Sequence, residues 1–135
     1  MEDLNNLKMF DIVSVNIPRT ENNISEQSGI HPYIIIQNNI GNKYSPTILG
    51  ISLTTKLKKA NMPVHCIVPK TESNGLKMDS MALAETLRQI DKKRIIKKVG
   101  NIDDIETQRK IIDIYIANIT GAYGNINEDG MLKVI

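Results

Sequence analysis

The stretch SEQSGIHPYIIIQNNIGNKYSPTILGISLTT, residues 25–55, decides the fold of this chain. Its apolar run at residues 33–36 is β-branched and aromatic, which predicts a buried strand. Turn residues follow at 38–42, and after a Ser-Pro step residues 47–54 predict a second strand. Side chains alternate along this second strand, with Leu49, Ile51 and Leu53 on one face and Gly50, Ser52 and Thr54 on the other. We expect the apolar face to pack and the small, polar face to let a ligand approach the backbone.

Size and composition predict one domain without covalent cross-links. At 135 residues the chain is long enough to bury a core, and its one cysteine, Cys66, excludes an internal disulfide and a cysteine-rich zinc site. The polar N-terminus lacks the apolar core of a signal peptide, and no apolar run approaches the roughly 20 residues of a membrane span. We therefore expect a cytoplasmic protein without a membrane segment.

The net charge of +2 is too small to predict nucleic-acid binding by itself. Basic side chains are nevertheless unevenly distributed along the chain. They cluster in two places, first Lys56, Lys58 and Lys59, and then Arg88, Lys92, Lys93, Arg94, Lys97 and Lys98. Such clusters are more often solvated faces than binding sites, so they do not decide the function.

Alternation of apolar and polar side chains predicts further strands at residues 11–17 and 62–68, with Pro18 ending the first. Residues 18–30 form a polar, glycine-containing loop that is long for a hairpin, so it is either mobile or functional. Residues 80–90 are ambiguous, because their propensity alone fits a helix.

The clearest helix spans residues 101–120. We expect Asp103 or Asn101 to cap its N-terminus, and Gly121 to end it. Its apolar stripe is expected to contain Ile105, Ile112, Ile116 and Ile119, widened by Ile111 and Tyr115. Residues 91–98 are expected to form a short helical turn. Several short strands and one late helix predict a mainly β domain, barrel-like, with the helix laid against it.

The string HPYIIIQNNIGNKYSPT, residues 31–47, resembles the signature of the MazF/PemK/Kid toxins, which carry R-P-hydrophobic-Q-N-D-x-G-N-x-x-S-P-T. The similarity continues through Asp79-Ser80 and through LRQIDKKRI at 87–95, which resembles that family's R-x-I-D-x-x-R-hydrophobic block. It extends over roughly residues 10–119, with the motifs in the same order, so chance is a poor explanation.

The resemblance implies an SH3-like β-barrel of the PemK/CcdB type that forms a homodimer, and it favours a strand for part of residues 80–90. On this basis we divide the chain into a polar N-terminal leader at 1–9, a single barrel domain with its C-terminal helix at 10–120, and a tail at 121–135.

The resemblance further implies a sequence-specific, metal-independent endoribonuclease that cuts single-stranded RNA and is neutralised by a MazE-like antitoxin. In that reaction a ribose 2′-OH attacks its own 3′-phosphate. The attack needs a base for the 2′ proton, hydrogen-bond donors or positive charge for the phosphorane oxygens, and an acid for the leaving 5′ oxygen. No cofactor or metal is expected, since His31 and His65 are the only histidines and neither belongs to a ligand motif.

One position departs from the family pattern, because His31 stands where active members have an arginine before the proline. Imidazole can act as a base or an acid near neutrality, but it lacks the permanent charge and the bidentate fork that grips phosphate. Three interpretations stay open for His31: a catalytic group that replaces the arginine, a loop residue held extended before a proline, and the mark of an enzyme that has lost cleavage.

The other predicted catalytic residues are Thr54 and Glu26, and both follow from the resemblance. Thr54 matches the strand-end threonine of the family, whose hydroxyl can donate to a phosphate oxygen. Glu26 matches the acidic residue of the S/T-E-Q loop, which is catalytic or contacts RNA in relatives. The alternatives are a threonine chosen for β propensity and a solvated loop glutamate.

Four further residues are predicted to bind RNA: Gln27, Ser28, Lys56 and Lys58. Gln27 and Ser28 belong to the same loop as Glu26, whereas the lysines follow Thr54 and can contact phosphates without specifying bases. Tyr33 and Tyr44 are expected to be core residues.

Two other functions remain possible at this stage. A binding module of the same fold, with RNA or antitoxin contact but weak or no catalysis, would account for His31. A CcdB-like poison of a topoisomerase is disfavoured, because the motifs match the ribonuclease branch.

Overall fold

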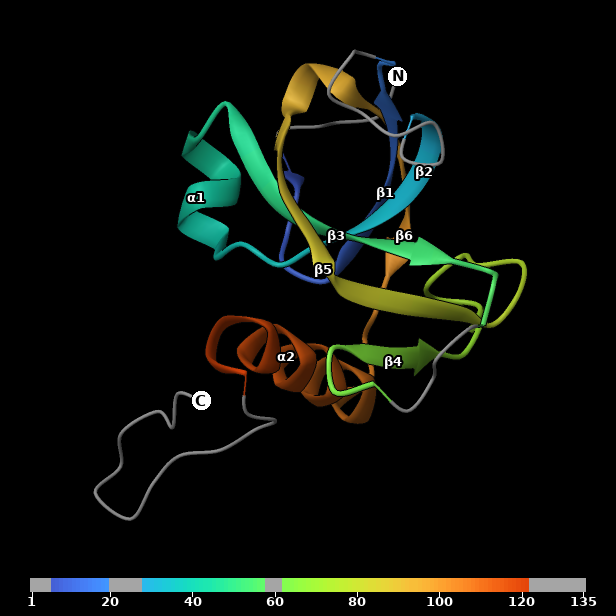
Figure 1. The fold of residues 1–135 in the computed structure, drawn as a ribbon. Coiled ribbons are helices and arrows are strands. Elements are labelled where there is room, and N and C mark those ends of the chain that lie inside the picture. Colours follow the sequence, from blue (N-terminus) through green and yellow to red (C-terminus); the bar gives the residue numbers. More distant parts are fainter. Residues whose placement is uncertain (1–5, 20–27, 58–61, 122–135) are drawn as a thin grey trace.

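The structure, a computed structural model, describes residues 6–19, 28–57 and 62–121 (Figure 1). Its elements are, in chain order, β1 (Asp11–Ile17), β2 (Gly29–Ile35), α1 (Asn39–Tyr44), β3 (Thr47–Thr54), β4 (His65–Val68), β5 (Ser80–Asp91), the 3₁₀ turn η3 (Lys92–Arg94), β6 (Ile95–Asn101) and α2 (Ile105–Thr120).

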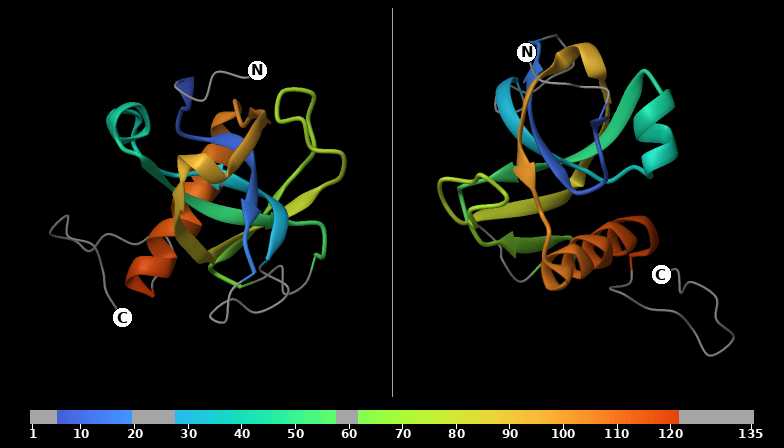
Figure 2. Two further views of the ribbon diagram at one scale, coloured as in Figure 1. Left: turned by 90° about the horizontal axis from the view of Figure 1, so that it is seen from above. Right: turned by 180° about the vertical axis from the view of Figure 1, so that it is seen from behind.

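The six strands form one sheet in the order β4-β5-β3-β2-β1-β6, and every neighbouring pair is antiparallel. The sheet curls strongly, and α2 lies along the side of β4 and β5 (Figures 1 and 2). The predicted class, mainly β with a C-terminal helix, is confirmed. In the described ladders β4 and β6 remain the two edges, so the barrel is an open curled sheet rather than a closed one.

Two apolar clusters fill the two sides of the sheet. The first lies between the sheet and α2, and its members include Ile51, Leu53, Ala82, Ile111 and Ile114. The second lies inside the curl, and its members include Val13, Val15, Tyr33, Ile48 and Ile90. Because apolar side chains from both faces are removed from water, the middle of the sheet is stabilised from both sides.

This arrangement limits the prediction that a ligand can approach the backbone on the face of Gly50, Ser52 and Thr54. On that face Gly50 is buried, as is the preceding residue of the same face, Ile48. Only Ser52 and Thr54 keep partial exposure there. The accessible part of that face is therefore confined to the C-terminal half of β3.

The predicted strand at 11–17 is confirmed as β1, whereas two others differ in their bounds. The strand expected at 33–36 begins at Gly29, because residues 29–34 pair with β1. His31 consequently lies within a strand rather than in a loop. The strand expected at 62–68 is only the four residues of β4.

The turn predicted at residues 38–42 is wrong, because a helix, α1, begins at Asn39. Asn38 caps it by accepting a hydrogen bond from the Gly41 main-chain nitrogen at 2.8 Å. Asparagine side chains make the same kind of local hydrogen bond in turns, so the sequence signal for the two structures is the same. Tyr33 is core as expected, but Tyr44 at the end of α1 is 73% exposed, so the prediction that it is core is wrong.

Residues 80–90 do form a strand, β5, and this confirms the prediction based on the resemblance. The helical turn predicted for 91–98 shrinks to the three residues of η3, capped by Asp91. No strand was predicted for β6, which pairs with β1 through two register shifts. Its alternation is weak, since Ile96 and Lys97 are both exposed at this sheet edge.

The late helix is confirmed, but its start and its buried face are not as predicted. It begins at Ile105, and its cap is Asp104 rather than Asp103 or Asn101. Its buried apolar residues are Ile111, Ile114 and Ala117, whereas Ile105 and Ile119 of the predicted stripe are 73% and 58% exposed. Gly121 ends the helix with a φ of 74°, as predicted.

The predicted division into leader, domain and tail remains a prediction, because residues 1–5 and 122–135 lie outside the described part of the chain. Within the described part, no helix is long and apolar enough to cross a membrane.

Candidate functional site

His31 and Thr54 stand on neighbouring strands at the same end of the sheet. Toward this end, the last paired residues of β2 and β3 are Tyr33 and Ser52. Two residues beyond this last pair are His31 on β2 and Thr54 on β3, outside the paired stretch. The alternation of side chains places both on the sheet face of Tyr33 and Ser52. The other face is the one that α2 covers, because Leu53 packs in the cluster that includes Ile111 and Ile114.

The His31 ring is held by the chain before it. Its Nε2 lies 2.6 Å from the main-chain carbonyl oxygen of Ser28. Gly29, between them, has a φ of 96°, a conformation that glycine adopts without strain. A carbonyl oxygen can only accept, so Nε2 is the donor and carries the hydrogen. In its neutral form His31 therefore presents Nδ1 as the unprotonated nitrogen.

Thr54 ends β3, and its side chain is partly exposed. Its Oγ1 accepts a hydrogen bond from the Lys56 main-chain nitrogen at 3.1 Å. Because the hydroxyl serves as an acceptor in this contact, its own hydrogen remains available to donate to a ligand. Lys56 itself is exposed. This end of the sheet thus presents an imidazole and a hydroxyl, followed by an ammonium group.

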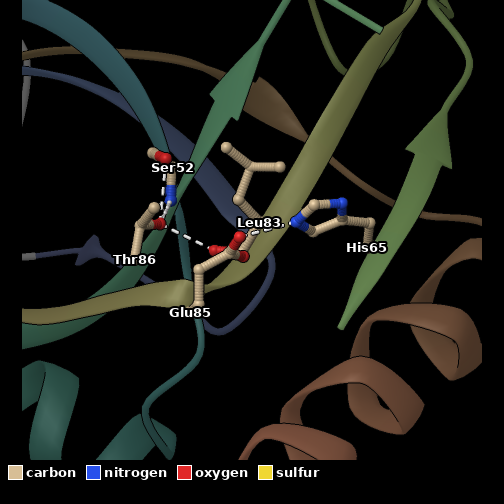
Figure 3. Close-up of polar contacts among 5 residues, drawn as sticks. All are labelled: Ser52, His65, Leu83, Glu85 and Thr86. Atoms are coloured by element: carbon tan, nitrogen blue, oxygen red, sulfur yellow. Dashed lines mark hydrogen bonds and ion pairs between the residues drawn. The ribbon is translucent and has the colours of Figure 1, made fainter. Parts of the chain in front are cut away.

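A β-bulge lies next to this position, between β3 and β5. Gly50 is opposite Arg88 and Ser52 is opposite Leu83, so Ile51 alone faces residues 84–87. Thr86 fixes the bulge by donating from Oγ1 to the Leu83 carbonyl oxygen at 2.7 Å (Figure 3). Its two other contacts, to the main-chain nitrogen and Oγ of Ser52, are each 2.9 Å long, and in both Thr86 must accept.

The bulge carries Glu85 toward β4. Its Oε2 lies 2.6 Å from Nε2 of His65, the first residue of β4 (Figure 3). The carboxylate accepts this bond, so Nε2 of His65 donates it. The His65 side chain is only 5% exposed, whereas that of Glu85 is 47% exposed. His65 is opposite Leu83, which is opposite Ser52, so the histidine lies on the face of His31 and Thr54.

Not every predicted site residue can be placed. His31 contacts Ser28 at the start of β2, and Thr54 contacts Lys56 at the end of β3, the neighbouring strand. Glu26, Gln27 and Lys58 lie outside the described residues, and their predicted roles remain predictions.

Sequence reasoning missed the Glu85–His65 pair and the hydroxyls of Ser52 and Thr86. The sequence contains one signal for the pair, because a glutamate such as Glu85 within the strand SMALAETLRQI is unusual unless it has a polar partner or a functional role.

The remaining reactive groups give little alternative chemistry. Within the described ranges, no group of three or more His, Cys, Asp and Glu side chains could hold a metal ion. Burial raises the pKa of the Cys66 thiol to about 11, and the thiol packs in the cluster beneath α2. A thiol in such surroundings is mostly protonated near neutrality and inert.

Comparison with known proteins gives concordant matches. The family of PemK-like, MazF-like toxins of type II toxin–antitoxin systems matches residues 8–114. Endoribonuclease EndoA of Bacillus subtilis is 40% identical over 80 residues, which are 59% of this chain and 68% of that protein.

Solved structures of low sequence identity share the fold. MazF of Deinococcus radiodurans, in crystal form I, is 16% identical and matches with a TM-score of 0.66 over 86% of this chain and 97% of its own. A mycobacterial endoribonuclease solved in complex with its cognate antitoxin is 17% identical and has a TM-score of 0.65 over 84% of this chain and 94% of its own.

Proposed function

The chain belongs to the PemK-like, MazF-like toxins of type II toxin–antitoxin systems, and we propose that it is a sequence-specific endoribonuclease that cleaves single-stranded RNA without a metal. The observation that carries this proposal is that His31 and Thr54, both partly exposed, lie on one face at the same end of the neighbouring strands β2 and β3, beyond the last pair of these strands. These two side chains supply the proton transfer and the hydrogen-bond donor that cleavage by a 2′-OH requires.

In the proposed reaction the 2′ oxygen attacks the adjacent phosphorus, and the bond from phosphorus to the 5′ oxygen breaks. Nδ1 of His31 accepts the 2′ proton, because Nε2 already donates to Ser28. The Thr54 hydroxyl donates to a phosphorane oxygen. The leaving 5′ oxygen takes a proton from an acid, for which the Glu26 carboxyl is the proposed source. The products are a cyclic phosphate and a 5′-hydroxyl, and hydrolysis of the former leaves a 3′-phosphate.

The positively charged side chains near the site have a positioning role in this proposal. Lys56 and Lys58 contact phosphates, which fixes the RNA strand without specifying bases. Gln27 and Ser28 shape the loop over the same strand. We further propose that the protein works in the cytoplasm as a homodimer and is silenced by a MazE-like antitoxin. This last point follows the complexes solved for a mycobacterial endoribonuclease and for MazE-MazF of Deinococcus radiodurans.

The test is to incubate the purified protein with a long, unstructured RNA in EDTA and to map the new 5′ ends. We expect discrete cuts with 5′-hydroxyl ends, and their loss in His31→Ala and in Thr54→Ala. Thr54→Ala should keep the melting temperature, because its partly exposed hydroxyl contributes little to stability. Asp79→Ala, at an exposed position outside the proposed site, serves as the control that still cleaves.

Two results would oppose the proposal. Absence of cuts from a folded protein that still binds RNA or antitoxin would favour the binding module, an alternative that the family membership and the EndoA match do not favour. Cuts that persist in both variants would show that other residues perform the reaction.

A further inference from the structure

We propose that Glu85, held by His65, reads a nucleobase of the bound RNA by accepting a hydrogen bond from its exocyclic amino group. The inference rests on the proposed ribonuclease function and adds a specificity-determining residue to it. It assigns a role to the Glu85–His65 pair, which the proposed reaction does not use.

The position of the pair supports this role. The row formed by Ser52, Leu83 and His65 runs across three strands, next to the row that begins with Thr54. Two residues along a strand span about 7 Å, so the two rows lie side by side on the same face. In this proposal the RNA strand has its scissile phosphate at Thr54 and runs across β5 toward β4, along the row that carries His65.

The position of Glu85 is fixed by the bulge and by the hydrogen bonds that stabilise the bulge. In a regular ladder between β3 and β5, residues 84–87 would not include unpaired extra residues. The Thr86 hydroxyl stabilises the bulge with one hydrogen bond that it donates and two that it accepts. Bulges re-aim side chains beside functional sites. Here the bulge places a half-exposed carboxylate against an almost fully buried imidazole.

The chemistry of the carboxylate selects its ligand. One oxygen, Oε2, accepts from His65 at 2.6 Å, and no contact in the described part of the chain uses Oε1. A carboxylate repels phosphate and has no hydrogen to donate, so it suits the edge of a base that presents an amino group. Cytosine N4, adenine N6 and guanine N2 are such groups, whereas uracil carries two carbonyl oxygens and no amino group.

Recognition of single-stranded RNA commonly works in this way, with bases splayed out and read on their edges. We therefore expect one position close to the cleaved bond at which uracil is disfavoured. The loss of one hydrogen bond to a charged group predicts about a tenfold preference for bases with the amino group over uracil at this position.

The experiment uses an RNA with a randomised segment and sequences the ends that the full-length protein produces in EDTA. Wild type should show the bias against uracil at one position. Glu85→Gln, which can donate to uracil O4 through its amide, should lose the bias and gain cuts at uracil while it keeps cleaving. His65→Phe, which removes the donor that orients Glu85, should weaken the same bias. Glu72→Gln, at an exposed position in the loop after β4, should leave it unchanged.

A structural role for the pair would lower stability in the variants without changing which base is preferred, so the sequence bias separates the two roles. An unchanged bias in a Glu85→Gln protein that cleaves would overturn this inference and leave the proposed function standing. Complete loss of cleavage in Glu85→Gln, with the fold intact, would also overturn it, since Glu85 would then be needed for the reaction itself. If wild type makes no cuts, the proposed function fails first.

Discussion

Nε2 of His31 lies 2.6 Å from the carbonyl oxygen of Ser28, and this contact fixes which nitrogen of the ring can take a proton. The nitrogen that faces the carbonyl must carry hydrogen, so Nδ1 is the only basic atom of the neutral ring. The contact also joins Ser28, the residue directly before β2, to His31 within that strand. The positioning bond of His31 and its proposed chemical function therefore use two different atoms of the ring.

Replacing His31 with glutamine separates these two functions. The glutamine amide can still donate to the Ser28 carbonyl oxygen, but it offers no basic nitrogen. We expect His31→Gln to keep the melting temperature of the wild type and to lose cleavage by about a hundredfold or more, the usual contribution of a general base. Cleavage rates and thermal unfolding measure the two effects separately. Full activity in His31→Gln would show that the ring acts only through its contact with Ser28.

Replacing His31 with arginine tests whether the site lacks charge or uses the imidazole. Arginine restores the family residue, with permanent charge and a fork that binds two phosphate oxygens. We expect His31→Arg to cleave, and to do so with a weaker dependence on pH between 5 and 8 than the wild type, since guanidinium does not titrate there. His31→Lys, which has charge without the fork, is the matched control. An inert His31→Arg protein that folds normally would argue that other parts of the site have changed as well.

The bulge of β5 should depend on one hydroxyl. In Thr86→Val the main-chain nitrogen of Ser52 and the carbonyl oxygen of Leu83 lose their partner, while the size of the side chain is kept. Leaving such groups unpaired costs about 1–3 kcal/mol of unfolding free energy, measured by chemical denaturation. Ser52→Ala removes only the contact between the two hydroxyls and should cost less. Equal stability of Thr86→Val and wild type would mean that water replaces the hydroxyl.

Much of this molecule is predictable from local pattern. The strand of residues 11–17 shows clear alternation of apolar and polar side chains. The end of α2 is predictable because Gly121 readily adopts the left-handed backbone conformation that ends a helix. The resemblance supplied what periodicity did not, namely the strand at β5, which the structure confirms, and the roles of His31 and Thr54, which remain predictions.

The errors have physical causes. Asn38 has the side chain of a turn residue, and its oxygen caps a helix with the same hydrogen bond. The wrong stripe on α2 arose because isoleucines occur around most of the helix, so only the contact with β4 and β5 decides which of them are buried. β6 carries lysines at a sheet edge and lacks a clear period.

The pairing of Glu85 with His65 could not be predicted from the sequence either. It depends on the register of β3 against β5 and on a bulge, and neither is encoded in local periodicity.

The cap of α2 gives a prediction with a defined pH dependence. Asp104 Oδ2 accepts from the Thr107 main-chain nitrogen at 3.0 Å, and hydrogen bonding with Thr107 lowers the pKa of the Asp104 carboxyl below its ordinary value. A carboxyl whose pKa is lower in the folded state stabilises the fold above its unfolded pKa. That stabilisation is lost as the pH falls through the folded pKa, which lies below the ordinary pKa of an aspartate carboxyl.

We therefore expect Asp104→Ala to lower the free energy of unfolding by about 1 kcal/mol at pH 7, and by less at pH 3. Asp104→Asn keeps an oxygen that can cap the helix, so it should cost little at pH 7 while losing the acid-dependent part. Chemical denaturation at the two pH values measures both effects. Asp103→Ala, one residue earlier and exposed, is the matched control and should stay close to the wild type. A larger loss in Asp103→Ala than in Asp104→Ala would assign the cap to Asp103, because the acidic side chain that bonds the first turn is the one whose removal weakens the helix.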